Sequence, residues 1–283
     1  MECRLISVDP TVMASSLSEV AGVLAGLVFA GIVVLLGGAN HRAQRIRAAM
    51  LLVSGLCAMV VASVFFAIIA GETICLRALG LQAVAVSLLG VGATAIFGGI
   101  ALLVHAHDDL GHAARLAGLG SLLVGIFALF YAVLAPQNFG AEMTASGVVS
   151  FQTTWFSPIY VHLQKITAGI VLVTVLVRAV VARLRPRRAA EGSHALVIVA
   201  AYTSVLYIAM AALVGWVLLG YPTTDWGPGT SVSGELVRTF CYTIATSAAL
   251  AIALQLIALP VSRPPVPAGS GTEPVRDQVT AGS

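Results

Sequence analysis

Long apolar runs without charged residues recur along the chain, and no other sequence feature constrains its fold as strongly. The run from Ile166 to Val177 shows the pattern most clearly, because Trp155 and Phe156 precede it and an arginine cluster begins after it at Arg178. A run flanked by aromatic residues at one end and basic residues at the other is typical of a helix that crosses a bilayer. The sequence therefore predicts an integral membrane protein.

Composition supports the same class. Hydrophobic residues make up 59% of the 283 residues and charged residues 10%, which leaves too few polar groups to cover a water-soluble globule of this length. The chain is therefore expected to be covered by a lipid bilayer. The formal net charge of +3 comes from arginines gathered in a few connections rather than along a basic face with aromatic residues. This distribution excludes nucleic acid as a partner.

The apolar runs predict an all-α integral membrane protein, a seven-transmembrane helix bundle. The predicted spans are 19–38, 48–70, 78–104, 116–135, 156–182, 195–219 and 235–260. Residues 1–18 are expected to be a retained extracellular lead, because they lack the positive region and the cleavage site of a signal peptide. Residues 261–283 are rich in proline, glycine and serine and are expected to form a disordered cytoplasmic tail.

The basic residues predict the orientation of the bundle. If the N-terminus lies outside, eleven of the fifteen basic residues fall in the inner connections and the tail, and such an excess marks the cytoplasmic side. We therefore expect the C-terminus in the cytoplasm. Arginine outnumbers lysine fourteen to one, as a GC-rich codon supply would produce. We accordingly expect a multi-pass protein of a plasma membrane, the inner membrane of a bacterium.

Lys165 is the single lysine of the chain and lies inside the fifth predicted span. It precedes Arg178 by thirteen residues, which places its amine roughly 20 Å from the arginine end of a hydrocarbon layer about 30 Å thick. An amine at that depth must be paired, wetted or extended toward the headgroups. Two alternatives follow: Lys165 pairs with Glu235, Glu19 or Glu72, or it extends outward along the aromatic end of its own helix.

Other polar residues are predicted at the same outer level. His162 and Lys165 are three residues apart and share a helix face, and a polar row descends along the seventh span. Together they predict an outward-facing polar vestibule that binds a ligand. The candidate ligand-binding residues are Lys165, His162, Gln164, Glu235, Arg238, Tyr242, Glu19 and Glu72. The alternative, which we prefer for Glu19 and Glu72, is that these are helix-end groups in the headgroup layer.

The sixth span carries hydroxyl residues near the middle of the membrane. They are Tyr202, Thr203, Ser204 and Tyr207. One interpretation is that they continue a polar route from the vestibule. The commoner behaviour of such hydroxyls is to bond back to their own helix and line nothing.

Small residues four apart predict close helix packing in two spans. Gly22, Gly26 and Ala30 form such a stripe on the first span, and a second stripe on the third span consists of Gly90, Thr94 and Gly98. Small residues on one face allow two helix backbones to approach closely where lipid offers no hydrophobic drive. Both stripes are expected to be contacts inside the bundle, with a dimer face as the alternative.

One connection has the spacing of metal ligands. In a helical continuation His105 with Asp109, and Asp108 with His112, would lie four apart, and imidazole and carboxylate together suit zinc or manganese. His107 is a further candidate ligand. Any short cytoplasmic turn needs polar residues, whether or not it binds a metal. A glycine also interrupts the helix that the ligand spacing would require. We therefore expect no metal and no other cofactor.

Three functions remain compatible with these residues. The first is a transport or sensing protein that binds a small ligand or ion, an anionic one included, in the outer vestibule. The second is a noncatalytic membrane partner or assembly subunit, and the third is a metal-dependent membrane enzyme at the cytoplasmic face. No catalytic residues are assigned, because phosphate-binding loops, nucleophile elbows and HExxH motifs are absent from the sequence. Cys3 and Cys75 both fall on the outer side, where a disulfide and two free thiols are both compatible with the sequence.

Overall fold

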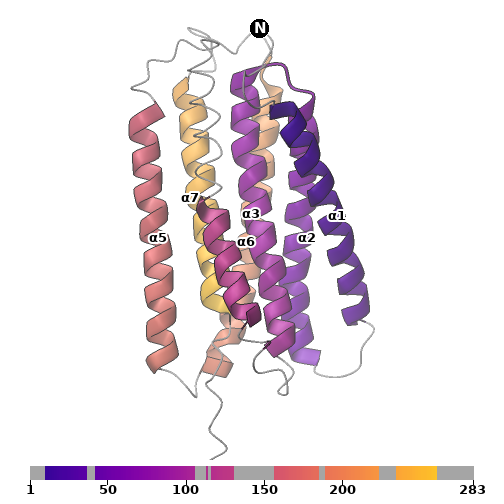
Figure 1. The fold of residues 1–283 in the computed structure, drawn as a ribbon, viewed down its shortest axis with the longest axis vertical. Helices are drawn as coiled ribbons and strands as arrows, with labels where there is room; N and C mark the ends of the chain where they lie inside the picture. The colour runs from indigo at the N-terminus through magenta and orange to yellow at the C-terminus, as the bar shows by residue number, and fades with distance from the viewer. Residues whose placement is uncertain are drawn as a thin grey trace, which may run out of the picture.

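The protein is a bundle of α-helices. The computed structural model describes residues 10–36, 42–105, 113, 116–130, 156–184, 189–222 and 234–259. The labelled helices are α1 (Pro10–Leu36), α2 (Arg42–Ala70), α3 (Cys75–His105), α5 (Phe156–Leu184), α6 (Ala189–Gly220) and α7 (Gly234–Ala258). A shorter apolar helix, helix 116–130, spans Leu116–Phe130. Figure 1 shows these helices side by side with their axes close to one direction. The predicted all-helical fold is confirmed for the described residues.

Four helices are long and apolar enough to cross a membrane. Within the described part of the chain these segments are Met13–Val33, Arg45–Ala70, Gly80–Val104 and Ala195–Gly220. They overlap the first, second, third and sixth predicted spans. In lipid every backbone N–H and C=O must be bonded within the segment, which a continuous helix achieves. The described residues thus form a helical bundle in which four helices are long and apolar enough to cross a membrane.

Several helices extend beyond the apolar runs. α1 begins at Pro10, and proline suits the first turn of a helix because the N–H that it lacks would have no partner there. A helix can continue past the hydrocarbon layer, so these bounds locate helices and leave the membrane boundaries as predictions.

Residues 1–9, the tail 261–283 and Cys3 lie outside the described residues, as does the side chain of Cys75. The cysteine pairing stays untested.

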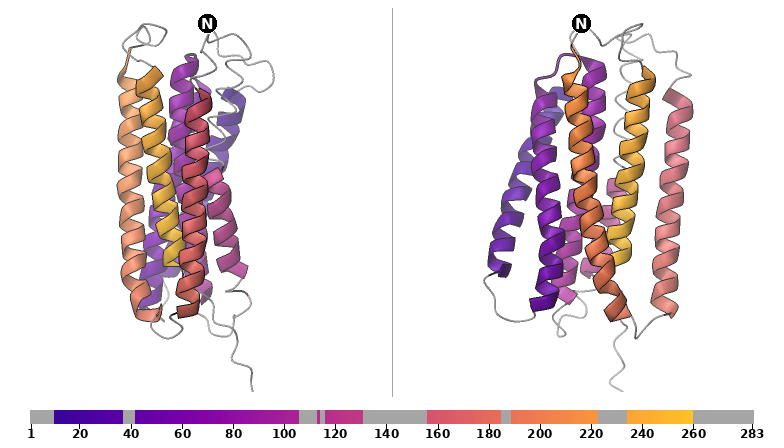
Figure 2. Two further views of the ribbon diagram at one scale, coloured as in Figure 1. Left: turned by 90° about the vertical axis from the view of Figure 1, so that its left-hand side faces the viewer. Right: turned by 180° about the vertical axis from the view of Figure 1, so that it is seen from behind.

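α3 is the central helix of the bundle. It contacts α2, α6 and α7, and its residues 80–88 are all buried. α1 packs against α2 at one edge, and α5 packs against α7 at the opposite edge (Figure 2). The chain alternates in direction, so that α1, α3, α5 and α7 begin at the end where the N-terminus lies, and α2 and α6 begin at the other (Figure 1).

The contact between α2 and α3 depends on two facing glycines. A Cβ at Gly92 would lie 3.2 Å from the carbonyl oxygen of Gly55 and 3.1 Å from the Cβ of Ala58. A Cβ at Gly55 would lie 3.1 Å from the carbonyl oxygen of Gly92. The two backbones therefore touch at this crossing, as small residues permit in membrane helices.

The two predicted stripes of small residues behave differently. Gly90 and Gly98 are buried on α3, where a Cβ at Gly90 would meet Ala128 at 3.1 Å and one at Gly98 would meet Leu259 at 3.3 Å. On α1, Gly26 is exposed and a Cβ there would have nothing within 4 Å. The packed face of α1 instead carries Ala21, Ala25, Val28 and Ile32. The α3 stripe is confirmed as an internal contact, and the same prediction for the α1 stripe is wrong at Gly26.

Candidate functional site

The predicted vestibule begins on α5, the helix at one edge of the bundle. Lys165 and His162 are both exposed, and Lys165 has no carboxylate partner among the described residues. The side chain of Gln164 lies outside those residues. The packed face of α5 carries Thr167 and Thr174, which are 4% and 3% exposed. Lys165 precedes Thr167 by two residues, a rotation of about 200° around the helix, and so lies on the face opposite the packed one.

The acidic partners proposed for Lys165 are spread across the bundle. Glu19 is exposed on α1, and α1 and α5 lie at opposite edges (Figure 2). The structure therefore does not bring Glu19 to Lys165. Glu235, Arg238 and Tyr242 belong to α7, the helix that α5 contacts, and their side chains lie outside the described residues. The pairing of Lys165 with Glu235 stays a prediction.

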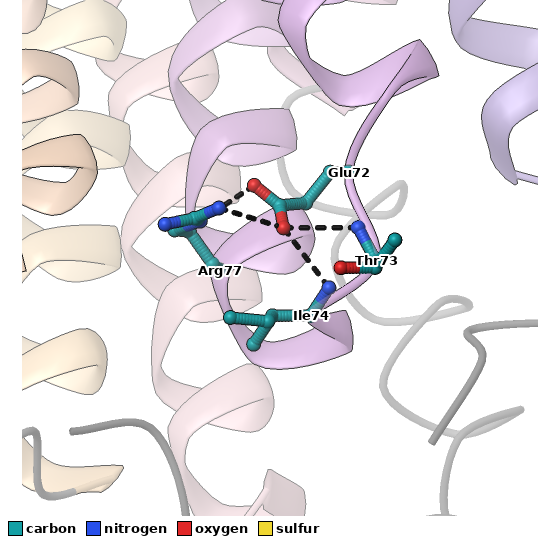
Figure 3. Close-up of polar contacts among 4 residues, drawn as sticks. All are labelled: Glu72, Thr73, Ile74 and Arg77. Atoms are coloured by element: carbon teal, nitrogen blue, oxygen red, sulfur yellow. Dashed lines mark hydrogen bonds and ion pairs between the residues drawn. The ribbon is translucent and has the colours of Figure 1, made fainter. Parts of the chain in front are cut away.

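The carboxylate of Glu72 forms hydrogen bonds within the turn between α2 and α3 (Figure 3). Its Oε1 accepts hydrogen bonds from the backbone N–H of Thr73 and of Ile74, each at 2.9 Å, and from Nη2 of Arg77 at 2.9 Å. Its Oε2 accepts a bond from Nε of Arg77 at 2.5 Å. The carboxylate is 3% exposed and joins the end of α2 to the first turn of α3. Glu72 thus stabilises the turn at a helix end, whereas its predicted place in a headgroup layer stays a prediction.

The metal-ligand candidates lie at the opposite end of the bundle. α3 ends at His105, and His107, Asp109 and His112 lie outside the described residues. Over the described part of the chain, no group of three or more His, Cys, Asp or Glu side chains could hold a metal ion. The metal hypothesis for this connection is therefore neither supported nor contradicted.

The bundle interior holds a polar core cluster, which we define as Ser87 and the Val91 carbonyl of α3, Ser204 and Tyr207 of α6, and Gln255 of α7. The Tyr207 hydroxyl donates to Oγ of Ser87 at 2.5 Å. Nε2 of Gln255 donates to Oγ of Ser204 at 2.8 Å and to the Val91 carbonyl at 3.4 Å. All four side chains are 3% exposed or less. The cluster links the three helices at the centre of the bundle.

One acceptor of this cluster has no partner. Oε1 of Gln255 is buried and accepts no hydrogen bond from any described residue. Oε1 of Gln82, earlier on α3, is buried and unpartnered in the same way. A buried carbonyl without a donor is costly in an apolar surrounding, so these two oxygens can receive a water, an ammonium-like group or a cation. The cluster itself holds no charged side chain.

Sequence reasoning found part of this cluster. Thr203 and Ser204 bond back to the carbonyls of Val199 and Ala200 on their own helix, whereas Tyr207 bonds across to Ser87 of α3. A polar route from the vestibule stays a prediction. Tyr202 is 67% exposed and lines nothing inside the bundle. Gln255 was missed, although a lone amide in the apolar second half of the seventh span was a usable signal.

The Tyr207–Ser87 bond predicts unequal effects for its two partners. Tyr207→Phe should lower the free energy of unfolding by about 1 kcal/mol, because Ser87 still donates to the Val84 carbonyl at 2.8 Å. Ser87→Ala should cost about 2 kcal/mol, because it leaves the Tyr207 hydroxyl buried without an acceptor. Unfolding in mixed detergent micelles measures both values. The reverse order would contradict this hydrogen bond.

Comparisons of the chain with protein-family models, with curated proteins and with solved structures found no match.

Proposed function

We propose that this chain is a seven-span protein of a bacterial plasma membrane that transports or senses a small ligand or ion. The N-terminus would lie outside and the C-terminus in the cytoplasm. The alternating helix directions support this orientation, because the ends of α5 and helix 116–130 that adjoin arginines lie together, opposite the N-terminus (Figure 1). That arrangement is the expected one if the arginine-rich end faces the cytoplasm.

The polar core cluster is the observation that carries this proposal. A bundle that only had to be stable in lipid would not gain from a buried amide with an unpaired carbonyl, since polar groups inside membranes are costly and usually functional. Gln255 contributes such a carbonyl on the central helix contact, where α3, α6 and α7 meet. Ligand would enter from the outer end of the bundle and reach this oxygen.

Gln255→Leu separates a functional role of this amide from a structural one. Ser204 keeps its own bond to the Ala200 carbonyl at 2.7 Å, and leucine removes the unpaired oxygen, so the melting temperature should stay unchanged or rise. Any ligand response should disappear. The assay is melting of purified protein with sodium, potassium, ammonium, chloride and acetate salts, followed by flux into liposomes for each salt that stabilises it.

Lys165→Met tests, in the same assay, whether this exposed lysine attracts an anionic ligand to the outer end of the bundle. We expect it to weaken the response to the salt at least about tenfold. The free energy of unfolding should stay within about 1 kcal/mol of the wild-type value, because Lys165 is exposed. Glu19→Gln is the matched control, because Glu19 is exposed at the opposite edge of the bundle. A wild-type protein that responds to none of the salts, or a Gln255→Leu variant with an undiminished response, would remove the proposal.

A noncatalytic partner subunit is the second candidate, and the Tyr207–Ser87 bond favours it, because that bond joins two helices and leaves no free group. In this case the cluster only locks α3 to α6 and α7. Co-purification of a second membrane protein in fixed stoichiometry, combined with no salt response, would support this role over transport.

A further inference from the structure

Arg178 belongs to the packed face of α5. Thr167, Ile170 and Thr174 are buried or half-buried at three- and four-residue steps, and Arg178 continues this row one turn later. Nη2 of Arg178 lies 3.9 Å from the position that a Cβ at Gly118 of helix 116–130 would occupy. The guanidinium group therefore lies against a neighbouring helix.

Two donors at this place have no acceptor among the described residues. Nη1 of Arg178 is buried and makes no hydrogen bond, and the same holds for Oγ of Ser121, a residue that is 0% exposed. Other buried helical hydroxyls in this protein bond to the preceding turn, as Ser54 does at 2.8 Å and Ser204 at 2.7 Å. Ser121 departs from that behaviour.

Ser121 lies on the Gly118 side of its helix. Residues three apart on a helix are surface neighbours, about 5–6 Å apart at Cβ, so the Ser121 hydroxyl is within one turn of the guanidinium contact at Gly118. A Cβ at Gly125, four residues further along the same face, would lie 2.9 Å from Leu256 of α7. Ser121 is thus on the side of helix 116–130 that packs against α5 at Gly118 and against α7 at Gly125, within about one helical turn of Arg178.

An oxyanion satisfies both donors. The planar guanidinium binds phosphate through two parallel N–H groups, and a neighbouring hydroxyl can donate to a third oxygen. Arg178 precedes the end of α5 at Leu184 by six residues, roughly 9 Å. That depth suits a headgroup phosphate, and basic pockets between helices on the cytoplasmic side are known to bind such groups.

We propose that Arg178 and Ser121 form a phosphate-binding site, in which the ligand accepts hydrogen bonds from Nη1 of Arg178 and from the Ser121 hydroxyl. The phosphate belongs either to the headgroup of an anionic lipid or to free inorganic phosphate. The site is independent of the proposed transport or sensing route, because it involves neither Gln255 nor Lys165.

Melting of the purified full-length protein in detergent tests the site. One arm compares phosphatidic acid with diacylglycerol of the same acyl chains, and the other compares sodium phosphate with sodium chloride at equal ionic strength. Wild type should be stabilised by the phosphate-bearing member of at least one pair, and the responding pair identifies the source. Arg178→Gln should weaken the apparent affinity about 10- to 100-fold. Stabilisation by neither pair, or an equal response of Arg178→Gln, overturns the proposal.

A second pair of variants keeps the charge in place. Gly118→Leu fills the space beside the guanidinium and should reduce the response at least about tenfold. Gly120→Leu is the matched control, because a Cβ at Gly120 would have nothing within 4 Å, and it should respond as wild type does. Ser121→Ala should give an intermediate loss. These variants decide the question even if Arg178→Gln melts too early to assay, since equal responses of Gly118→Leu and Gly120→Leu overturn the site.

Discussion

Gly92→Leu is expected to prevent stable folding, with a loss of more than about 3 kcal/mol in the free energy of unfolding. A Cβ at Gly92 already lies 3.2 Å from a backbone oxygen of α2, and the remaining leucine atoms would have to displace that helix. α2 also contacts α1 and α6, so displacing α2 would disturb its packing against both of these helices. Yield and melting temperature of the purified protein in detergent measure the effect.

The matched control for this variant is Gly26→Leu. Gly26 is also a helical glycine, but it is exposed and a Cβ there would have nothing within 4 Å. Leucine should leave stability unchanged or raise it by up to about 1 kcal/mol, because glycine is a poor helix former. Equal melting temperatures for the two variants would contradict the close approach of α2 and α3 at Gly55 and Gly92.

Glu72→Ala is expected to lower the free energy of unfolding by about 3 kcal/mol. The substitution removes the carboxylate that binds Arg77 through two hydrogen bonds and accepts two backbone N–H groups. It leaves the guanidinium, 16% exposed, without its partner. Glu72→Gln should cost less, because the amide oxygen can still accept the backbone bonds. Melting of the two variants against wild type measures the difference.

Glu19→Ala is the control for Glu72→Ala. Both residues are carboxylates, but Glu19 is exposed whereas Glu72 is 7% exposed. Surface charges away from a network usually change stability by less than about 0.5 kcal/mol. A loss of similar size for the two alanine variants would show that the Glu72–Arg77 pair does not hold the turn between α2 and α3.

The helices could be predicted from the sequence because an uncharged apolar run of membrane length has essentially one way to satisfy its backbone in lipid. The helical positions of all seven predicted spans follow from this rule over the described residues. The α3 stripe was also predictable, since buried glycines mark close contacts wherever a helix is surrounded by others. The α1 prediction failed at Gly26 because α1 lies at an edge of the bundle, and a Cβ at that position would meet no neighbouring atom within 4 Å.

The candidate site was less predictable. Lys165 attracted attention because a charge in an apolar run is conspicuous, yet it lies on the exposed face of an edge helix. Arg178 was assigned to the inner basic cluster, although its spacing from Thr174 and Thr167 places it on the packed face. Gln255 was recognisable only as a lone amide in an apolar run, and Ser121 only as a lone hydroxyl, so the sequence did not indicate what either side chain contacts.

The sequence by itself determined that the chain is helical and, to within several residues at some helix ends, where the helices lie. The tertiary structure alone decided that α3 is central, that α1 and α5 form the edges, and which polar side chains meet inside the bundle. The physical reason is that lipid and protein interior are both apolar, so a membrane helix can be apolar on every side and its pattern of hydrophobic residues does not mark the packed face. Only the packing of one helix against another makes that choice.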